Sequence, residues 1–374
     1  MRTSRVLLAL ILVLLVLLPV SCILEGFGRE VISAEVDAGH DVEVEGAVAC
    51  PHQGPPAVPT DAPPGATETF VVAMRSIDLR EGTGAVPIGF DLDKTCSCQG
   101  ESASCREPSK TPVCDGINGI DNAATGLFRL IQAAVGGTDK FGSSFFSAEA
   151  NQGIWSILFR VHGYNGLADD DTVEFDFYPT AGGVDKPDGG AAAWDGLDSW
   201  PVSTTALADG KSVDKPKFKN LQAYVSNHVL VASLPQSSFT LGGTGVSTVT
   251  IRLTGGIVTA RIVRTDGGGP WTLREGVFAG RWSLPDVFLS LSTFRDNNGA
   301  PICKGNVAYE FGKSTICSGA DILSGPGVAS DACDALSFAV GFTADPAQLG
   351  VAVDPTLPSK FCVDGGDPAG DTCP

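Results

Sequence analysis

The distribution of cysteine most constrains how this chain can fold. The sequence has 374 residues and 11 cysteines, and residues 115–302 contain none of them. If Cys22, near the N-terminus, is set aside, five cysteines precede this stretch and five follow it. Because five is an odd number, complete pairing needs at least one disulfide between the early and late groups. We therefore expect the two ends of the stretch to fold back together on one domain. The cysteines expected to pair are Cys50, Cys96, Cys98, Cys105, Cys114, Cys303, Cys317, Cys333, Cys362 and Cys373.

The N-terminus has the pattern of a secretory signal peptide. Two arginines precede an unbroken apolar run at residues 6–18, which is short for a membrane span. Cys22 follows the sequence Leu-Pro-Val-Ser, which resembles the end of a bacterial lipoprotein signal. Ser21 fits that pattern, whereas Pro19 stands where leucine is usual. Ordinary signal cleavage and an uncleaved N-terminal anchor therefore remain alternatives.

Lipid attachment would also explain the odd cysteine, because the other ten can then all pair. We expect Cys22 to carry a lipid and the protein to be exported to the cell envelope, at the outer membrane or the cell surface. The membrane is then a partner through this anchor. One acyl chain holds a protein weakly, so stable attachment requires additional chains.

Charge and composition narrow the class of partner. The formal net charge is -18, and lysine and arginine form no cluster beyond the signal, so nucleic acid is not an expected partner. The acidity is typical of a protein that stays soluble outside the cell. The 46 glycines and 24 prolines, against 2 methionines, indicate many turns and few long helices.

Three regions follow from these patterns. Residues 1–21 are expected to be the signal peptide, and residues 22–66, which are acidic and then rich in proline, a tether. His40 and His52 lie in this tether, where we expect them to be solvated. Residues 67–374 are expected to form the disulfide-stapled domain.

Apolar residues with a period of two predict a mainly β domain. Residues 172–178, TVEFDFY, place Val173, Phe175 and Phe177 on an inner face. Residues 221–234 read as a hairpin, and residues 246–263 as a second one that turns at Gly255-Gly256.

Helical periodicity is confined to two segments, residues 122–135 and 284–295. The first should end at Gly136, and Ser283 should cap the second. The whole pattern predicts an antiparallel β-sandwich, a jelly roll of the concanavalin-like type, with two short helices and disulfide-stapled ends.

The segment VCDGINGIDN, residues 113–122, resembles the calcium loops of secreted bacterial proteins. Its acidic and amide residues are three apart rather than two, and no glutamate closes the set. Asp121 could instead cap the helix that follows, and the two roles are compatible. The cysteine spacing does not match a zinc site, and export favours disulfides. The sequence therefore leaves two alternatives for a cofactor: a structural calcium ion, or no cofactor. Its candidate ligands are Asp115, Asn118, Asp121, Asp91 and Asp93.

Two further sets of residues suggest carbohydrate chemistry. Glu174 and Asp176 match the first two positions of the E-x-D-x-x-E motif of concanavalin-like glucanases, but Pro179 holds the third. Retaining hydrolysis needs two carboxylates about 5 Å apart, so a polar outer strand face is the simpler interpretation. Trp194 and Trp200 flank an aspartate-containing loop and could stack on a sugar, although tryptophan more often packs.

The ordered motifs GFDLD, VCDG, GIDN, RVHGYNG, AGRW and CDALSFAVGF resemble a group of exported bacterial proteins without an assigned activity. The resemblance spans residues 68–345 and implies a shared secreted fold and no chemistry. We expect an envelope lipoprotein with a non-enzymatic β-sandwich that binds a ligand, a glycan or another envelope protein. The alternative is a carbohydrate-active enzyme that uses Glu174 and Asp176.

Overall fold

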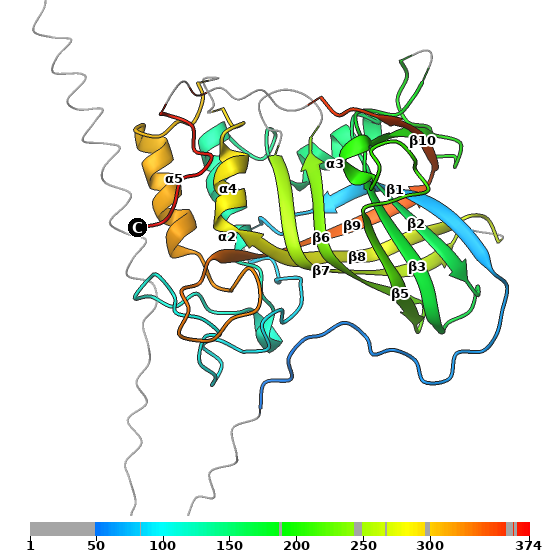
Figure 1. Ribbon diagram of the computed structural model, residues 1–374, viewed down its shortest axis with the longest axis horizontal. Helices are drawn as coiled ribbons and strands as arrows, with labels where there is room; N and C mark the ends of the chain where they lie inside the picture. The colour runs from blue at the N-terminus through cyan, green and yellow to red at the C-terminus, as the bar shows by residue number, and fades with distance from the viewer. Residues whose placement is uncertain are drawn as a thin grey trace, which may run out of the picture. The chain divides into compact units, whose positions relative to one another are not determined.

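Eight antiparallel strands form one sheet that closes on itself (Figure 1). The order of the strands follows the chain, and the last strand pairs with the first. The mainly β, antiparallel fold is therefore confirmed. Its up-and-down connectivity differs from the jelly roll that we expect, because neighbours in the chain are neighbours in the sheet. The strands are β1 (Glu68–Asp78), β2 (Ile157–Tyr164), β3 (Asp170–Pro179), β5 (Phe218–Ser226), β6 (Val229–Leu241), β7 (Val249–Arg264), β8 (Trp271–Ser283) and β9 (Ala335–Pro346).

The structure is a computed structural model, and it describes most of the chain beyond the N-terminal region. The expected signal peptide, Cys22 and His40 lie outside the described residues. Residues 49–66, part of the expected tether, contact the domain: Gln53 N–H donates to the Asn118 carbonyl (2.8 Å), and Asn165 Nδ2 donates to the Pro63 carbonyl (3.0 Å). The described residues are 49–82, 84–186, 189–242, 249–265, 268–295, 300–356, 362 and 365–374.

Aromatic side chains fill the interior of the closed sheet. Val173, Phe175 and Phe177 face this core and are at most 1% exposed, as their alternation predicts. Phe159 on β2 packs against Phe175 with ring centroids 5.6 Å apart, and Phe278 on β8 packs against Phe177 at 5.4 Å. Ring pairs at such distances stabilise a core beyond their buried area.

The predicted hairpin at Gly255-Gly256 is wrong, because β7 passes through both glycines as one strand paired with β6 along its length. Gly255 has φ +57, and the register with β8 shifts between Thr254 and Ile257. The two glycines therefore form a bulge rather than a turn.

The predicted β5–β6 hairpin is confirmed. Ser226 pairs with Val229, and the two residues between them, Asn227 and His228, have φ values of 49° and 64°. A two-residue loop with both φ values positive suits the twist of an antiparallel pair.

Helices cover parts of the sheet, and Figure 1 shows α2, α4 and α5 together at the left of the view. The two predicted helices are confirmed as α2 and α4. Gly136 ends α2 in the left-handed conformation, and the Ser283 side chain accepts a hydrogen bond from Asp286 N–H at the start of α4. The sequence does not predict α3 and α5. The helices are α2 (Ala124–Val135), α3 (Ser143–Gln152), α4 (Leu284–Leu291) and α5 (Val307–Ser318).

All ten expected cysteines are paired, and one bridge joins the early and late groups as their odd numbers require. Cys105 and Cys333 form this bridge. The disulfides are Cys50–Cys96, Cys98–Cys114, Cys105–Cys333, Cys303–Cys362 and Cys317–Cys373.

A small parallel sheet of β4 (Ser199–Ser203) and β10 (Gln348–Val353) lies outside the closed sheet. Trp200 and Val202 on β4 pack with Leu158 on β2 and Tyr178 on β3 in a second apolar cluster. The outer face of β3 is therefore covered in part. Within the described part of the chain, no helix is both long and apolar enough to span a membrane.

Candidate functional sites

Four aspartates meet beside the Cys50–Cys96 disulfide. Carboxylate oxygens of Asp91, Asp93 and Asp121 lie within 4.8 Å of one another, and Asp115 is close enough to interact electrostatically with this group. Two oxygens that share a calcium ion are separated by at most twice the calcium–oxygen distance of about 2.4 Å. The three carboxylates can therefore coordinate one ion.

Backbone amides of the loop between residues 91 and 97 fix these carboxylates. Leu92 N–H donates to Asp121 Oδ2 (2.6 Å), Ser97 N–H to Asp115 Oδ2 (2.5 Å) and Lys94 N–H to Asp91 Oδ1 (2.6 Å). The interpretation of Asp121 as a helix cap is wrong, since the turn before α2 has no side-chain cap. Asp121 instead ties the start of the helix segment to the loop after β1.

Asn118 shapes the turn that precedes Asp121. Asn118 and Gly119 have φ values of 63° and 76°, and asparagine and glycine tolerate this left-handed conformation best. A Cβ on Gly119 would lie 2.8 Å from Cys96 Sγ and 3.3 Å from Asp91 Cγ. The glycine therefore allows the segment before Asp121 to approach the disulfide and the carboxylates.

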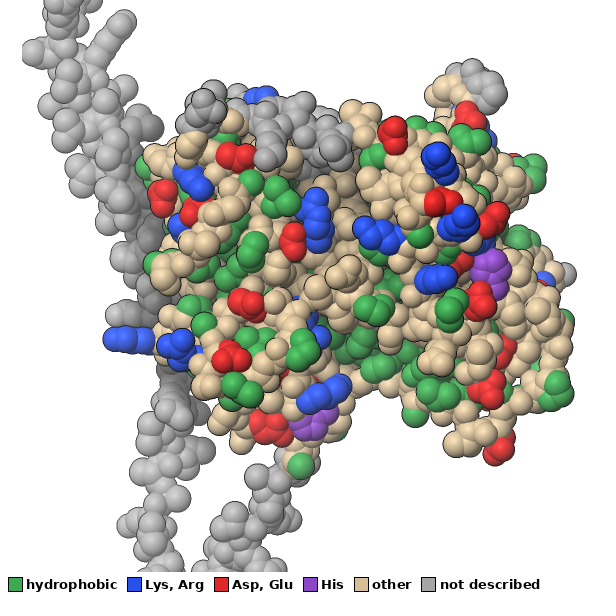
Figure 2. Space-filling view, in the orientation of Figure 1, with side chains coloured by type: hydrophobic (Ala, Val, Ile, Leu, Met, Phe, Trp, Pro, Cys, Tyr) green, Lys and Arg blue, Asp and Glu red, His purple; other side chains and the backbone are tan. Residues whose placement is uncertain are grey.

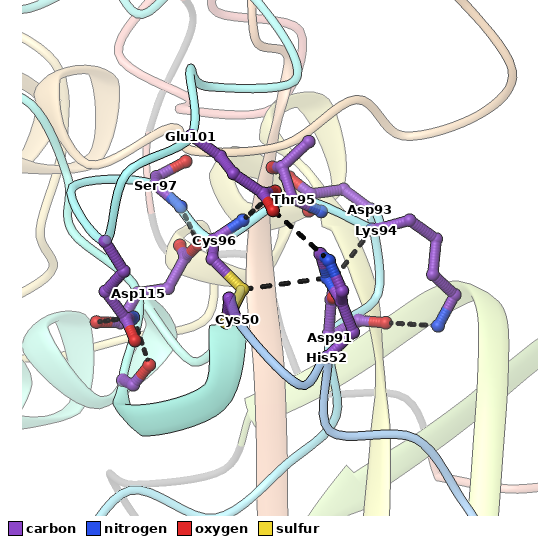
Figure 3. Close-up of a disulfide and its surroundings, with 12 residues drawn as sticks. Cys50, His52, Asp91, Asp93, Lys94, Thr95, Cys96, Ser97, Glu101 and Asp115 are labelled. Carbon is purple, nitrogen blue, oxygen red and sulfur yellow. Dashed lines mark hydrogen bonds and ion pairs between the residues drawn. A yellow bond between two sulfur atoms is a disulfide. The ribbon is translucent and has the colours of Figure 1, made fainter. Parts of the chain in front are cut away.

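His52 belongs to the site and is not a solvated tether residue. Figure 3 shows its ring beside the disulfide, between Asp91 and Glu101. His52 Nδ1 is 2.5 Å from Asp91 Oδ2, and Nε2 is 3.3 Å from Glu101 Oε1. Its position two residues after Cys50 is the signal for this placement, because a disulfide at Cys50 holds His52 near Cys96.

The site is strongly acidic for its degree of burial. Asp91 and Asp121 are 0% and 1% exposed. Lys94 Nζ and Arg281 Nη2 donate to the backbone carbonyls of Asp91 and Leu92 rather than to carboxylates. Among the described residues, the imidazole of His52 is thus the ion-pair partner of these carboxylates.

Burial and mutual repulsion raise the pKa values in this region. Desolvation, with Asp93, Asp321 and Asp115 nearby, raises the pKa of Asp121 to about 10. Desolvation, followed by repulsion from Asp93, raises the pKa of Asp115 to about 6. At neutral pH the carboxyl group of Asp121 therefore keeps its proton unless a bound cation replaces it.

The residues of the glucanase motif are placed differently. Glu174 is exposed on the outer face of β3 and lies opposite His162 in the register with β2. Asp176 is buried, and its Oδ2 accepts from Arg160 Nε (2.9 Å) and lies 3.1 Å from His162 Nε2. Tyr178 hydroxyl also donates to this oxygen (3.3 Å). Asp176 is therefore engaged in a closed ion-pair network.

The two tryptophans do not form an exposed platform, which corrects the expectation that both stack on a ligand. Trp200 is fully buried, and its ring centroid is 5.7 Å from that of Trp194. Trp194 Nε1 donates to the Asn151 carbonyl (3.0 Å), and the Arg75 guanidinium lies over its ring at 5.2 Å. Both rings are packing residues in this arrangement.

A polar cleft of about 540 Å³ lies between β5 and β6 and extends to α4. Serine or threonine supplies 12 of its 22 lining residues. Figure 2 shows a hollow near the middle of this face, floored by tan atoms and flanked on both sides by blue lysine or arginine side chains. This cleft is not predictable from the sequence, because its residues come from segments that are far apart in the chain.

The chain was compared with known proteins at three levels. No family model, no curated protein and no solved structure matches it. Its function is therefore inferred from the arrangement of its own side chains.

Proposed function

We propose that this protein is an exported, non-enzymatic binding module, attached to the cell envelope through a lipid on Cys22 and stabilised by a calcium ion. The ion would be held by Asp91, Asp93 and Asp121, with Asp115 and His52 supporting the ligands. The convergence of three carboxylates within 4.8 Å carries this proposal. Burying several carboxylates beside a single imidazole is costly, and calcium is a cation that takes carboxylate oxygens.

The disulfides and the cleft support the other parts of the proposal. Five disulfides are the usual sign of an oxidising, extracytoplasmic compartment. The cleft of about 540 Å³ falls within the range of small-molecule binding sites, about 300–1,000 Å³. The engagement of Asp176 by Arg160 favours a binding role over hydrolysis at β3.

Thermal unfolding with and without calcium tests the metal site. Calcium at about 100 times its dissociation constant should stabilise the wild type by about 2.7 kcal/mol, and therefore raise Tm by about 5 °C. Asp121→Asn should abolish this shift. Because it removes a buried carboxylate from the cluster, it should also be at least as stable as the wild type in chelator.

Asp171→Asn is the matched control, since Asp171 is an exposed aspartate of β3 outside the cluster. This variant should respond to calcium as the wild type does. A wild type whose Tm does not change between chelator and calcium would contradict the metal site. If calcium raised the Tm of Asp121→Asn as much as that of the wild type, the calcium site would have to lie elsewhere in the protein.

A further inference from the structure

The wall of the sheet splits between β5 and β6. The two strands pair only at Tyr224–Val231, Val225–Leu230 and Ser226–Val229. From Ala232 onward β6 continues to pair with β7, while β5 stays paired with β3. In Figure 1 the strands run together at the lower right and separate towards the top. The cleft fills this opening.

One wall of the cleft is a regular array of polar side chains. Because facing residues of two paired strands share one face of the sheet, three polar pairs from β6 and β7 lie along the cleft. In one of these pairs, Thr240 Oγ1 and Thr250 Oγ1 are 3.0 Å apart. The two hydroxyl groups of the pair could therefore donate to, or accept from, the same ligand group. The pairs are Gln236–Thr254, Ser238–Arg252 and Thr240–Thr250.

Two polar groups lining the cleft lack hydrogen bonds among the described residues. Ser237 Oγ is buried without a partner, and Ser237 as a whole is 2% exposed. Arg252 Nη1 is likewise buried without a hydrogen bond, since the nearest Asp286 oxygen is 3.8 Å away. Buried polar groups in native proteins normally have partners. Ser237 pairs with Leu253 on the core-facing side of the sheet, whereas Arg252 belongs to the polar array. Arg252 Nη1 is therefore the group that a ligand oxygen would satisfy.

We propose that this cleft binds a neutral saccharide, an inference that rests on the proposed binding function and names its ligand class. Sugar hydroxyls both donate and accept hydrogen bonds, as do the serine and threonine side chains that line the cleft. The charged lining residues are Lys217, Arg252 and Asp286, so one net positive charge remains, which the hydroxyl oxygens of a sugar can solvate. Apolar residues such as Leu289 and Pro355 also line the cleft and could contact the C–H faces of a sugar ring.

An extended peptide is the competing occupant, because the edge of β6 could pair with an added strand. Pro235 lies close to where β5 leaves β6. Proline has no N–H to donate to a ladder, so an added strand could not pair continuously along this edge. The saccharide is therefore the occupant that the geometry favours.

The test is glycan-array binding of the full-length exported protein, followed by titration of the best neutral glycan. Ser238→Trp should fill the cleft and weaken binding at least 10-fold. Ser233→Trp, an exposed position on the same strand outside the cleft, should stay within 2-fold. Arg252→Gln, which keeps a polar side chain and adds no bulk, should weaken binding about 5-fold or more even if Ser238→Trp fails to fold.

Failure to bind any neutral glycan would overturn the saccharide assignment, and so would equal affinities for the two tryptophan variants. Selection of peptides from a peptide library, blocked by Ser238→Trp, would reassign the cleft to peptide. Calcium-dependent Tm is measured on the same samples. If calcium raises Tm but no glycan binds, only the saccharide assignment is contradicted. If calcium does not change Tm, the proposed metal site is contradicted.

Discussion

Cys105 and Cys333 are bonded across 228 residues of sequence. The bond joins the loop that follows the acidic site to the segment immediately before β9. Cys105 Sγ also lies 3.4 Å from the Asp321 carbonyl oxygen, so the bridge packs against the segment that precedes β9. The closed sheet and the acidic site are therefore linked covalently through this disulfide.

Removing this bridge should be more damaging than removing a local one. In the chain-entropy model a loop of this length contributes about 5 kcal/mol, against about 3 kcal/mol for the 16-residue separation of Cys98 and Cys114. The remaining bridges shorten the effective loop, so we expect a difference of about 1 kcal/mol or more between the double serine variants. Denaturant unfolding measures both. Equal losses would show that the bridge constrains the unfolded chain no more than a local one.

Gly119→Ala should destabilise the domain and weaken its response to calcium. The variant combines a left-handed φ of +76 with a Cβ only 2.8 Å from Cys96 Sγ. Gly163→Ala is the matched control, since Gly163 has φ +78 and nothing within 4 Å. We expect about 1 kcal/mol for the control and at least twice that for Gly119→Ala. Equal destabilisation of the two variants would mean that the close approach at Gly119 carries no cost.

Stability in chelator should fall as pH rises from about 5 to about 8. Burial raises the pKa of Asp321 to about 7 from its ordinary 3.8. A folded state with the higher pKa binds the proton more tightly, so this stabilisation is complete below the unfolded pKa and is lost as pH passes 7. Asp115, with its pKa raised to about 6, acts in the same direction.

The Asp321→Asn variant isolates this contribution. Asparagine stays neutral and retains an oxygen for the Ser337 N–H, which donates to Asp321 Oδ1 (2.8 Å). The dependence of the unfolding free energy on pH should therefore become shallower in this variant than in the wild type. Urea unfolding at pH 5, 6.5 and 8 measures the slope, with Asp171→Asn as an exposed control. An unchanged slope would exclude Asp321 as its source.

Lipid attachment at Cys22 predicts that radiolabelled palmitate enters the wild type and not Cys22→Ala. The variant should also be released from the membrane fraction. Equal labelling of both proteins would reject Cys22 as the attachment site. Absence of label in the wild type would favour an ordinary signal peptide.

The sequence predicts the features of the fold that follow from the number of cysteines and from the alternation of apolar and polar residues. The odd numbers of early and late cysteines require a bridge such as Cys105–Cys333, and alternation places Phe175 and Phe177 in the core. Gly255-Gly256 shows the limit of such patterns, because two glycines suit both a turn and a bulge. Only the pairing with β6 and β8 distinguishes the two.

The candidate site is predictable in part. Disulfides near Asp91 and Asp121 are a reason to expect these carboxylates to meet, and the structure brings them together. The role of Asn118 is not visible in the sequence, because a ligand and a left-handed turn favour the same residue type. His52 is missed because the Pro-rich segment around it predicts a tether, whereas the Cys50–Cys96 bond holds it against the domain.

The positions of two disulfides also decide how the domain would bear mechanical load. The Cys50–Cys96 bond closes a covalent loop that contains all of β1, and the Cys105–Cys333 bond closes one that contains β2 through β8. A pull on the chain from its N-terminal side passes from Cys50 to Cys96, along a few residues to Cys105, and directly to Cys333. Seven of the eight strands of the closed sheet, all except β9, then lie outside the path of the force. Tension on a membrane anchor would therefore not peel them from the sheet unless the disulfides were first reduced.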